Sequence, residues 1–264
     1  MIKRHPVLYY IRYFLLSQNI SKKVSVDDVG CFNNINDVKD VPQLFFEVNH
    51  EMRLTGADEF EKAQEIAVFL RSRTPVGPAQ SKSSGRTLEG MLYGKGGVCS
   101  DFSQVFNIFC LINNIRVKEW NCVDTLYGAR FGHTFNEIYS SALQKWVAID
   151  THKGFYFTGD DDTPLSAIET FTRLRQVKKV DFVYFSEYRP PKPERLPMVY
   201  SASTIPFIIS NYRISVNDQY LSKFEKMPSL VSSLAMIFTG KNHRFTFVLD
   251  DYRKKMLPFL FKRN

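Results

Sequence analysis

Apolar residues recur at helical spacing in two segments of the first half of the chain. Residues 57–72 and residues 99–112 place them three and four positions apart, which is typical of an amphipathic helix. Asn113 and Asn114 follow the second run and predict its end. The apolar positions are Phe60, Ala63, Ile66, Ala67 and Leu70 in the first segment, and Phe102, Val105, Phe106, Phe109 and Ile112 in the second.

Strand patterns dominate the middle of the chain. Apolar and polar residues alternate in 115–123 and 133–139, and short apolar runs occupy 146–150 and 181–186. A helix over 163–171 is predicted, with Thr163 as N-cap and Pro164 in the first turn. A buried helix followed by several antiparallel strands indicates an α+β fold, which we expect to be papain-like or transglutaminase-like, with the nucleophile helix packed on the sheet.

Polar and turn-forming residues predict the connections. Residues 18–41 are expected to form a surface connection, and residues 74–87, rich in Pro, Gly and Ser, a flexible loop. The proline-rich stretch 189–197 predicts a boundary between a catalytic domain, residues 1–188, and a C-terminal extension, residues 189–264. Within that extension we expect a helix near 215–227 and a strand near 244–250.

Composition places the chain among ordinary globular proteins. It has 264 residues, 44% of them hydrophobic, with 23 Phe and 13 Tyr, which excludes collagen-like, low-complexity and fully disordered classes. The four cysteines form no C-x-x-C pair, so we expect a reducing compartment and a cytoplasmic protein. No apolar run reaches the roughly 18 residues of a membrane span. Residues 1–18 predict an amphipathic helix that suits a membrane interface.

Positive charge is concentrated in the last third of the chain. Residues 173–264 hold 17 Lys and Arg against 7 Asp and Glu, whereas residues 1–172 hold 18 against 20. Such an excess favours an anionic partner, either an anionic or glycan-linked substrate or an anionic membrane surface, and nucleic acid less so. Solvated surface charge that keeps the protein soluble is the alternative. The two chain ends, each basic and apolar, could also simply pack on each other.

Cys99 is the candidate nucleophile. It follows Gly96 and Gly97 and begins the predicted helix, where backbone N–H groups favour a thiolate and can face a developing oxyanion. We expect the two glycines to leave room for substrate. Cys110, in the helix, Cys122, in a strand, and Cys31, in a polar loop, are expected to be structural.

His133 and Asp150 are the candidate partners of Cys99. If strands 133–139 and 144–150 pair across a loop at 140–143, His133 lies opposite Asp150, and Glu137 lies opposite Trp146. Opposed residues share one face of a sheet with Cβ atoms about 5 Å apart. Asp150 could then orient the His133 imidazole, as nucleophilic cysteine catalysis requires.

These motifs resemble the transglutaminase-like superfamily. The resemblance covers residues 88–152 and consists of G-G-V-C-S-D, then H-T-F-N-E-I-Y, then K-W-V-A-I-D-T. It implies a papain-like core in which Cys99 is the nucleophile, His133 the general base and acid, and Asp150 the orienting group. The run G-G-V-C is also compatible with arylamine N-acetyltransferases, which the later motifs favour less.

The sequence departs from the protein-crosslinking animal members of this superfamily. Ser100 follows Cys99 where they have Trp, and both tryptophans lie downstream, so the side-chain oxyanion donor is unassigned, with Gln80 and Tyr93 as weak candidates. Residues 160–162, three Asp, lack the spacing and glycine of an EF-hand loop and suit the start of a helix instead. We expect no metal and no cofactor.

The sequence supports three hypotheses. The first is a thiol enzyme whose acyl-enzyme, formed from an amide or thioester substrate, is resolved by water or an amine. The second is a transglutaminase-like binding scaffold without turnover, which a plugged groove at Cys99 would favour. The third is a peripheral membrane protein held through the aromatic N-terminus and the basic C-terminus.

Overall fold

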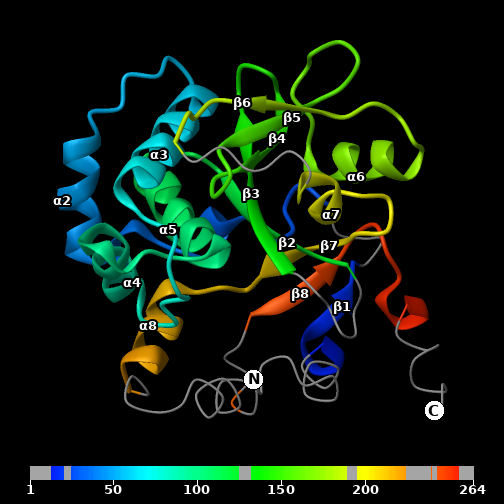
Figure 1. Cartoon of the computed structure of the whole chain (residues 1–264). Helices are drawn as coiled ribbons and strands as arrows, with labels where there is room; N and C mark the ends of the chain where they lie inside the picture. Colours follow the sequence, from blue (N-terminus) through cyan, green and yellow to red (C-terminus); the bar gives the residue numbers. More distant parts are fainter. Residues whose placement is uncertain are drawn as a thin grey trace.

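The computed structural model describes residues 13–20, 25–124, 132–188, 195–223, 239 and 243–255. Eight strands form one mixed sheet in the order β1-β8-β7-β2-β3-β4-β5-β6, antiparallel throughout except for the β1–β8 pair. Helices α2 to α5 lie on one side of this sheet and α6 and α7 on the other (Figure 1). The predicted α+β architecture, a helix that carries the candidate nucleophile packed on an antiparallel sheet, is confirmed.

Helices α3, α5, α6 and α8 lie where the sequence predicted helices, apart from their ends, whereas α2, α4 and α7 were not predicted. Helix α3 is capped by the Asp58 carboxylate, which accepts the N–H of Glu61. The helices are α2 (Gln43–Met52), α3 (Glu59–Arg73), α4 (Ser84–Gly90), the π-helical turn η4 (Met91–Lys95), α5 (Cys99–Ile112), α6 (Ala167–Arg175), α7 (Leu196–Val199) and α8 (Ile214–Lys223), with short 3-10 turns η2 (Phe32–Asn34) and η3 (Val38–Asp40).

Strands β2, β3, β4, β6 and β8 lie where the sequence predicted strands, whereas β1, β5 and β7 were not predicted. β2 and β3 form the centre of the sheet, and the segment after residue 189 adds β7 beside β2 and β8 beside β7. The strands are β1 (Ser17–Asn19), β2 (Val117–Val123), β3 (Gly132–Ser140), β4 (Lys145–Asp150), β5 (Phe155–Thr158), β6 (Asp181–Tyr184), β7 (Ile205–Ser210) and β8 (Arg244–Phe247). The division into two domains stays a prediction, and the described C-terminal strands belong to the common sheet.

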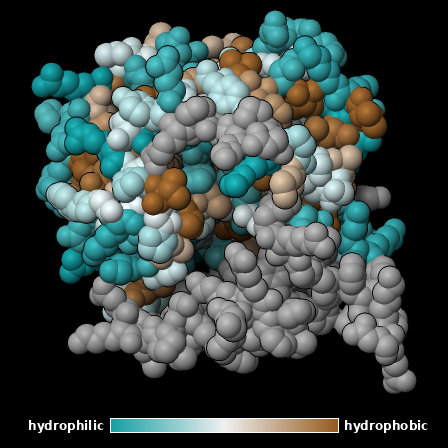
Figure 2. Space-filling model, viewed as in Figure 1, coloured by the Kyte–Doolittle hydropathy of each residue, from teal (hydrophilic) through white to brown (hydrophobic). Residues whose placement is uncertain are grey.

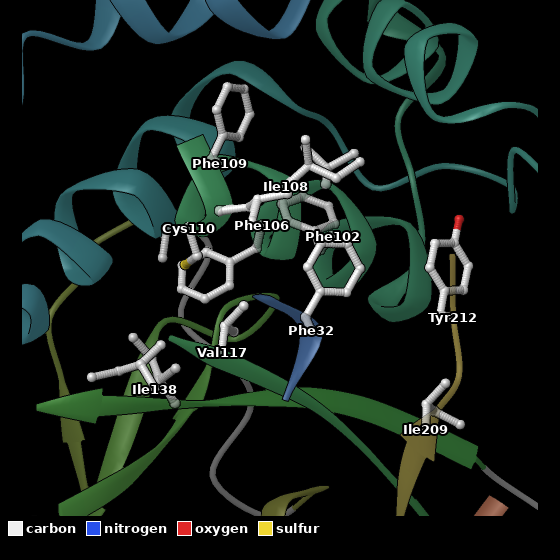
Figure 3. Packing of buried hydrophobic residues seen from close by; sticks show 14 of the residues in the cluster. Phe32, Phe102, Phe106, Ile108, Phe109, Cys110, Val117, Ile138, Ile209 and Tyr212 are labelled. Carbon is white, nitrogen blue, oxygen red and sulfur yellow. The ribbon is translucent and has the colours of Figure 1, made fainter. Parts of the chain in front are cut away.

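The main core lies between α5 and the sheet. Phe102, Phe106 and Phe109, three of the predicted apolar positions of α5, are fully buried and face Val117 and Ile138 of the sheet (Figure 3). Burying an aromatic or aliphatic side chain of this size stabilises a fold by about 1.5–3 kcal/mol. Helix α5 is therefore a rigid support for its own N-terminus, where Cys99 lies.

The described parts of the two chain ends pack against each other. β1 pairs in parallel with β8, and the Tyr13 ring lies 4.9 Å from the Phe245 ring and packs against Phe207. Tyr13 is buried, whereas Phe14 is exposed. Residues 13–16 are helical, residues 17–18 belong to β1 and correct the end of the predicted N-terminal helix, and residues 1–12 lie outside the described residues. Most of the two basic and apolar chain ends also lies outside the described residues, so their packing on each other stays a prediction.

Two predicted connections are corrected. Residues 74–87 are not simply a flexible loop, because α4 begins at Ser84 and Val76 pairs with Gly97. The connection 18–41 is not wholly on the surface, since Cys31 and Phe32 are buried there. Hydrogen bonds tie both segments to the core, which composition alone does not reveal.

The start of α6 is also corrected. Its N-cap is Ser166, whose hydroxyl accepts from the N–H of Glu169 while the Glu169 carboxylate accepts from the N–H of Ser166. This reciprocal capping box is stronger than the expected cap at Thr163, and the N–H of Leu165 bonds to β5 instead. Among the three aspartates, Asp161 caps Thr163 and Asp160 pairs with Arg173.

Most of the described surface in the view of Figure 2 is hydrophilic or of intermediate hydropathy, with scattered hydrophobic residues. Among the residues described here, no helix has the length and apolar character needed to cross a bilayer. Much of the basic segment lies outside the described residues. Its role in binding an anionic partner stays a prediction.

Candidate functional site

Cys99 is the first residue of α5, as predicted. Asp101, in the first turn, accepts the backbone N–H of Val98 at 3.0 Å and the backbone N–H of Gln80 at 3.1 Å through the same oxygen. An acidic side chain at this position caps the helix and suits its dipole. Asp101 thus holds both the helix start and the upstream loop around Cys99.

The glycines before Cys99 serve packing and not substrate access, which corrects the expectation. Gly96 has a φ of +73°, which favours glycine, and a Cβ there would lie 2.5 Å from the Pro75 carbonyl oxygen. A Cβ on Gly77 would lie 2.0 Å from the Lys95 carbonyl oxygen. Two chain segments therefore cross in close contact beneath Cys99, and side chains at these positions would separate them.

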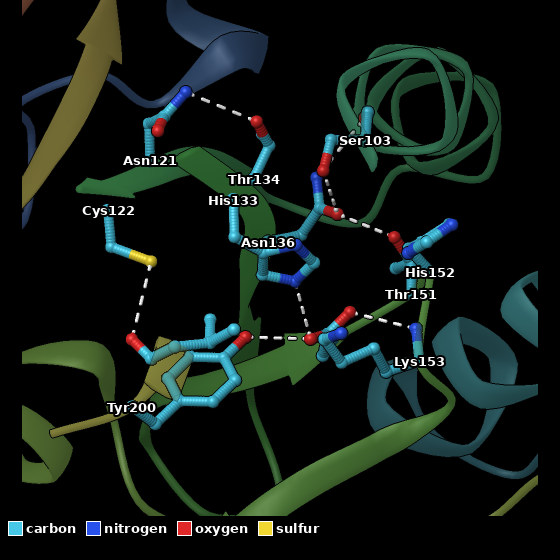
Figure 4. A network of polar contacts seen from close by, with 12 residues as sticks. Ser103, Asn121, Cys122, His133, Thr134, Asn136, Thr151, His152, Lys153 and Tyr200 are labelled. Atoms are coloured by element: carbon cyan, nitrogen blue, oxygen red, sulfur yellow. Dashed lines mark hydrogen bonds and ion pairs between the residues drawn. The ribbon is translucent and has the colours of Figure 1, made fainter. Parts of the chain in front are cut away.

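His133 and Asp150 are in direct contact. Nε2 of His133 lies 2.7 Å from Oδ2 of Asp150, and both side chains are buried (Figure 4). The predicted strand register is wrong by two residues, because Ser140 pairs with Lys145 and the loop is 141–144. A register shift of two residues keeps the side chains of His133 and Asp150 on the same face of the sheet. They therefore still meet, at diagonal positions instead of opposed ones.

The thiol of Cys99 completes this arrangement. The charge and side chain of His133, together with the backbone N–H of Thr134, act on the thiol and lower its pKa. Nε2 of His133 faces Asp150, so Nδ1 is the ring nitrogen left to serve Cys99. The structure therefore brings together the three residues that the sequence selected, on α5, β3 and β4.

The ionisation of the three groups is coupled. Burial raises the pKa of Cys99, but the charge and hydrogen bond of His133 outweigh it and leave the pKa lowered. Burial opposes protonation of His133, but Asp150 and Cys99 raise its pKa to about 9. The pKa of Asp150 is lowered, because His133 outweighs the effect of burial. A lowered thiol pKa beside a raised imidazole pKa favours a thiolate–imidazolium pair.

The other cysteines differ from Cys99 in burial. Cys31, Cys110 and Cys122 are buried, whereas Cys99 is half-buried, and all four are free thiols. Burial raises the pKa of Cys110 and of Cys122 well above the usual value. Cys99 alone therefore combines access with a lowered thiol pKa, in keeping with the expectation that the other three are structural.

A second histidine, His152, lies beside the pair and was not predicted. Its ring is 6.0 Å from that of His133 and packs edge-on against Phe102. Burial and the positive charge of His133 lower its pKa to about 3, so it is neutral. The buried guanidinium of Arg71 donates to the His152 carbonyl and to Ser186, which fixes the turn after Asp150.

Neither weak candidate for the side-chain oxyanion donor is well placed for it. Nε2 of Gln80 donates to the Gly96 carbonyl at 2.6 Å and to the Pro78 carbonyl at 3.3 Å. Tyr93 is 75% exposed on the π-helical turn. The first backbone N–H groups of α5, which have no acceptor within the helix, are the better donors for an oxyanion at Cys99.

A buried polar layer lies beneath α5 and also escaped the sequence analysis. Asn136 of β3 contacts Ser103, Asn107 and Thr151, and Asn107 donates to the Glu119 carboxylate at 3.1 Å. Burial, and then the charge of Cys99, raise the pKa of Glu119 to about 8. This layer fixes the height of α5 above β2 and β3.

The comparisons with known proteins agree with this site. Residues 47–151 match the family model of the transglutaminase-like superfamily. A crystal structure described as that of a "Putative Cysteine Protease" from Cytophaga hutchinsonii is 14% identical, with a TM-score of 0.33, over 50% of this chain and 44% of that one. The chain thus spans less than half of that protein. A search of curated proteins finds no match.

The matched segment begins in α2 and ends just after Asp150, and it includes Cys99 and His133. It therefore contains every residue of the predicted site. Residues 47–151 form a transglutaminase-like core.

Proposed function

We propose that this protein is a thiol enzyme that transfers or hydrolyses acyl groups through Cys99, His133 and Asp150. The observation that carries the proposal is the position of His133, whose Nε2 lies 2.7 Å from the carboxylate of Asp150 and whose charge lowers the pKa of the Cys99 thiol. That arrangement supplies a nucleophile, a proton carrier and an orienting group.

The reaction begins with the thiolate–imidazolium pair. Sγ of Cys99 attacks the carbonyl carbon of an amide or thioester, and the negative oxygen faces the N-terminus of α5. The carbon–nitrogen or carbon–sulfur bond of the substrate breaks, and His133 gives its proton to the leaving group. Water or an amine then attacks the thioester on Cys99, His133 takes the attacking group's proton, and the thiolate is restored.

Hydrolysis and transfer share every residue of this scheme. The outcome depends on whether water or an amine reaches the acyl-enzyme first. Cys99 is half-buried whereas the other three cysteines are buried, which supports an enzyme over the alternative of a silent binding scaffold. The match of residues 47–151 supports the transglutaminase-like scheme over an arylamine N-acetyltransferase-like one.

The test is detection of the acyl-enzyme. The protein is mixed with a small acetyl thioester at neutral pH, and intact-mass and peptide mass spectrometry locate any acetyl group. We expect one acetyl group on Cys99, and none in Cys99→Ala. Cys110→Ala, which removes a buried thiol, serves as the matched control and should acetylate as the unaltered protein does. Absence of acetylation on Cys99 with thioester and peptide amides alike would favour the scaffold.

A further inference from the structure

The carboxylate of Asp150 has a second side-chain partner besides His133. The hydroxyl of Tyr200 donates to Oδ2 of Asp150 at 2.7 Å, the same oxygen that contacts Nε2 of His133. The other oxygen accepts the backbone N–H of Lys153 at 2.9 Å. Figure 4 shows the contacts from Tyr200 and His133 converging on one carboxylate oxygen.

Tyr200 comes from outside the transglutaminase-like core. It follows α7 in the C-terminal segment, and its backbone N–H bonds to Leu196 at 2.8 Å. Its ring is buried and packs at 5.9 Å against the His133 ring, nearly perpendicular to it. Aromatic side chains of the sheet and of α6 surround the ring on its other sides: Phe135, Phe155, Phe157, Phe171 and Phe182.

We propose that Tyr200 is a positioning residue: its hydroxyl holds the Asp150 carboxylate, and through it the His133 imidazole, in the orientation that serves Cys99. This inference rests on the function proposed above. It makes the segment after residue 189 part of the active site, although the superfamily match ends at residue 151.

Two features separate this role from ordinary core packing. A buried tyrosine needs an acceptor for its hydroxyl, and here the acceptor is the one carboxylate that contacts His133. Because the ring is enclosed by five phenylalanines, the hydroxyl has a fixed position and cannot follow a moving carboxylate. A donor on Oδ2 also takes up part of its negative charge, which moderates the pull of Asp150 on the His133 proton.

The test measures the titration midpoint of His133 by NMR of the imidazole protons. The chain has five histidines, and His133→Gln identifies the signal. In Tyr200→Phe the full negative charge of Asp150 acts on His133, so we expect the midpoint to rise by about half a pH unit or more, given the energy of a hydrogen bond to a charged group. Tyr139→Phe is the matched control, because Tyr139 lies on β3 six residues from His133. This variant should leave the His133 midpoint unchanged.

A second variant keeps the hydroxyl and reverses the effect. Replacement of Tyr200 with 3-fluorotyrosine makes the hydroxyl a stronger donor, so the His133 midpoint should fall. If Tyr200→Phe does not fold, the His133 midpoint of the fluorotyrosine protein alone tests the inference. Midpoints that match that of Tyr139→Phe in the folded Tyr200 variants would overturn the inference and leave Tyr200 a packing residue.

The titration is independent of the reaction. Failure of Cys99 to form an acyl-enzyme would overturn the proposed function, even if the midpoint shifts as expected. An unchanged midpoint together with an acyl-enzyme on Cys99 would overturn only the role of Tyr200.

Discussion

The imidazole of His133 and the carboxylate of Asp150 lie 2.7 Å apart although the two residues are not opposite each other in the sheet. β3 and β4 pair Asn136 with Ile149, which places Asp150, the last residue of β4, diagonally from His133. Long side chains bridge such diagonal positions. The contact therefore depends on both side chains lying on the same face of the sheet, whereas the strand register changes only the distance that they must span.

The charge of Asp150 sets the ionisation of His133. Asp150→Asn keeps the shape of the side chain and removes its negative charge, so the His133 pKa should fall from about 9 by roughly one unit or more. NMR titration of the imidazole protons measures this shift. Asp161→Asn, which alters an exposed carboxyl at the start of the loop before α6, is the control. A midpoint that stays near 9 in Asp150→Asn would mean that the ion pair does not govern His133.

The buried carboxyl of Glu119 makes stability depend on pH. Its pKa of about 8 in the folded protein exceeds its usual 4.5, so the folded state holds a proton that the unfolded state releases between these values. The stabilisation is complete below pH 4.5 and is lost as pH rises towards 8, at up to about 1.4 kcal/mol per pH unit.

Glu119→Gln does not titrate and keeps an acceptor for Asn107. We therefore expect this variant to gain stability relative to the unaltered protein between pH 5 and pH 8, as measured by urea unfolding at each pH. Glu89→Gln, which changes an exposed carboxyl, is the control. A stability difference for Glu119→Gln that does not change with pH would show that Glu119 is ionised in the folded protein.

The carboxylate of Asp101 joins the loop of Gln80 to the start of α5. Asp101→Ala removes the acceptor of two backbone N–H groups, so we expect a loss of about 0.5–2 kcal/mol in the free energy of unfolding. Glu61→Ala, which removes the acceptor of the exposed Ala57 N–H just before α3, should cost less. Thermal unfolding of both variants makes the comparison. Equal losses would mean that Asp101 acts only as a surface cap.

Local sequence patterns were sufficient to predict helix α5, which carries Cys99. Glycines followed by Cys-Ser-Asp predicted its first residue, because the capping chemistry of Asp101 is local and the apolar stripe of α5 is regular. The shared face of His133 and Asp150 was also predictable, since side chains alternate strictly along a strand. The four-residue loop between β3 and β4 was predicted one residue too early, because periodicity fixes faces and not the residue at which a turn begins.

Contacts from distant segments escaped prediction for a different reason. Tyr200 reaches Asp150 across 50 residues, and the segment around it has no helical or strand period that points to the site. Glu119 occupies an ordinary polar position of an alternating strand, and only the helix packed over it makes it buried. The pairing of β1 with β8 joins the two ends of the chain, which no local signal indicates.

The central claim, that Cys99 is a nucleophile activated by His133, is tested most directly by alkylation of the folded protein. Iodoacetamide is applied at pH 7, and peptide mass spectrometry follows the rate at each of the four cysteines. We predict that Cys99 reacts well before Cys31, Cys110 and Cys122, and that in His133→Ala the pH midpoint of its alkylation moves upward, because the imidazolium no longer stabilises the thiolate. Labelling of Cys110 before Cys99, equal labelling of all four, or an unchanged midpoint in His133→Ala would contradict the account.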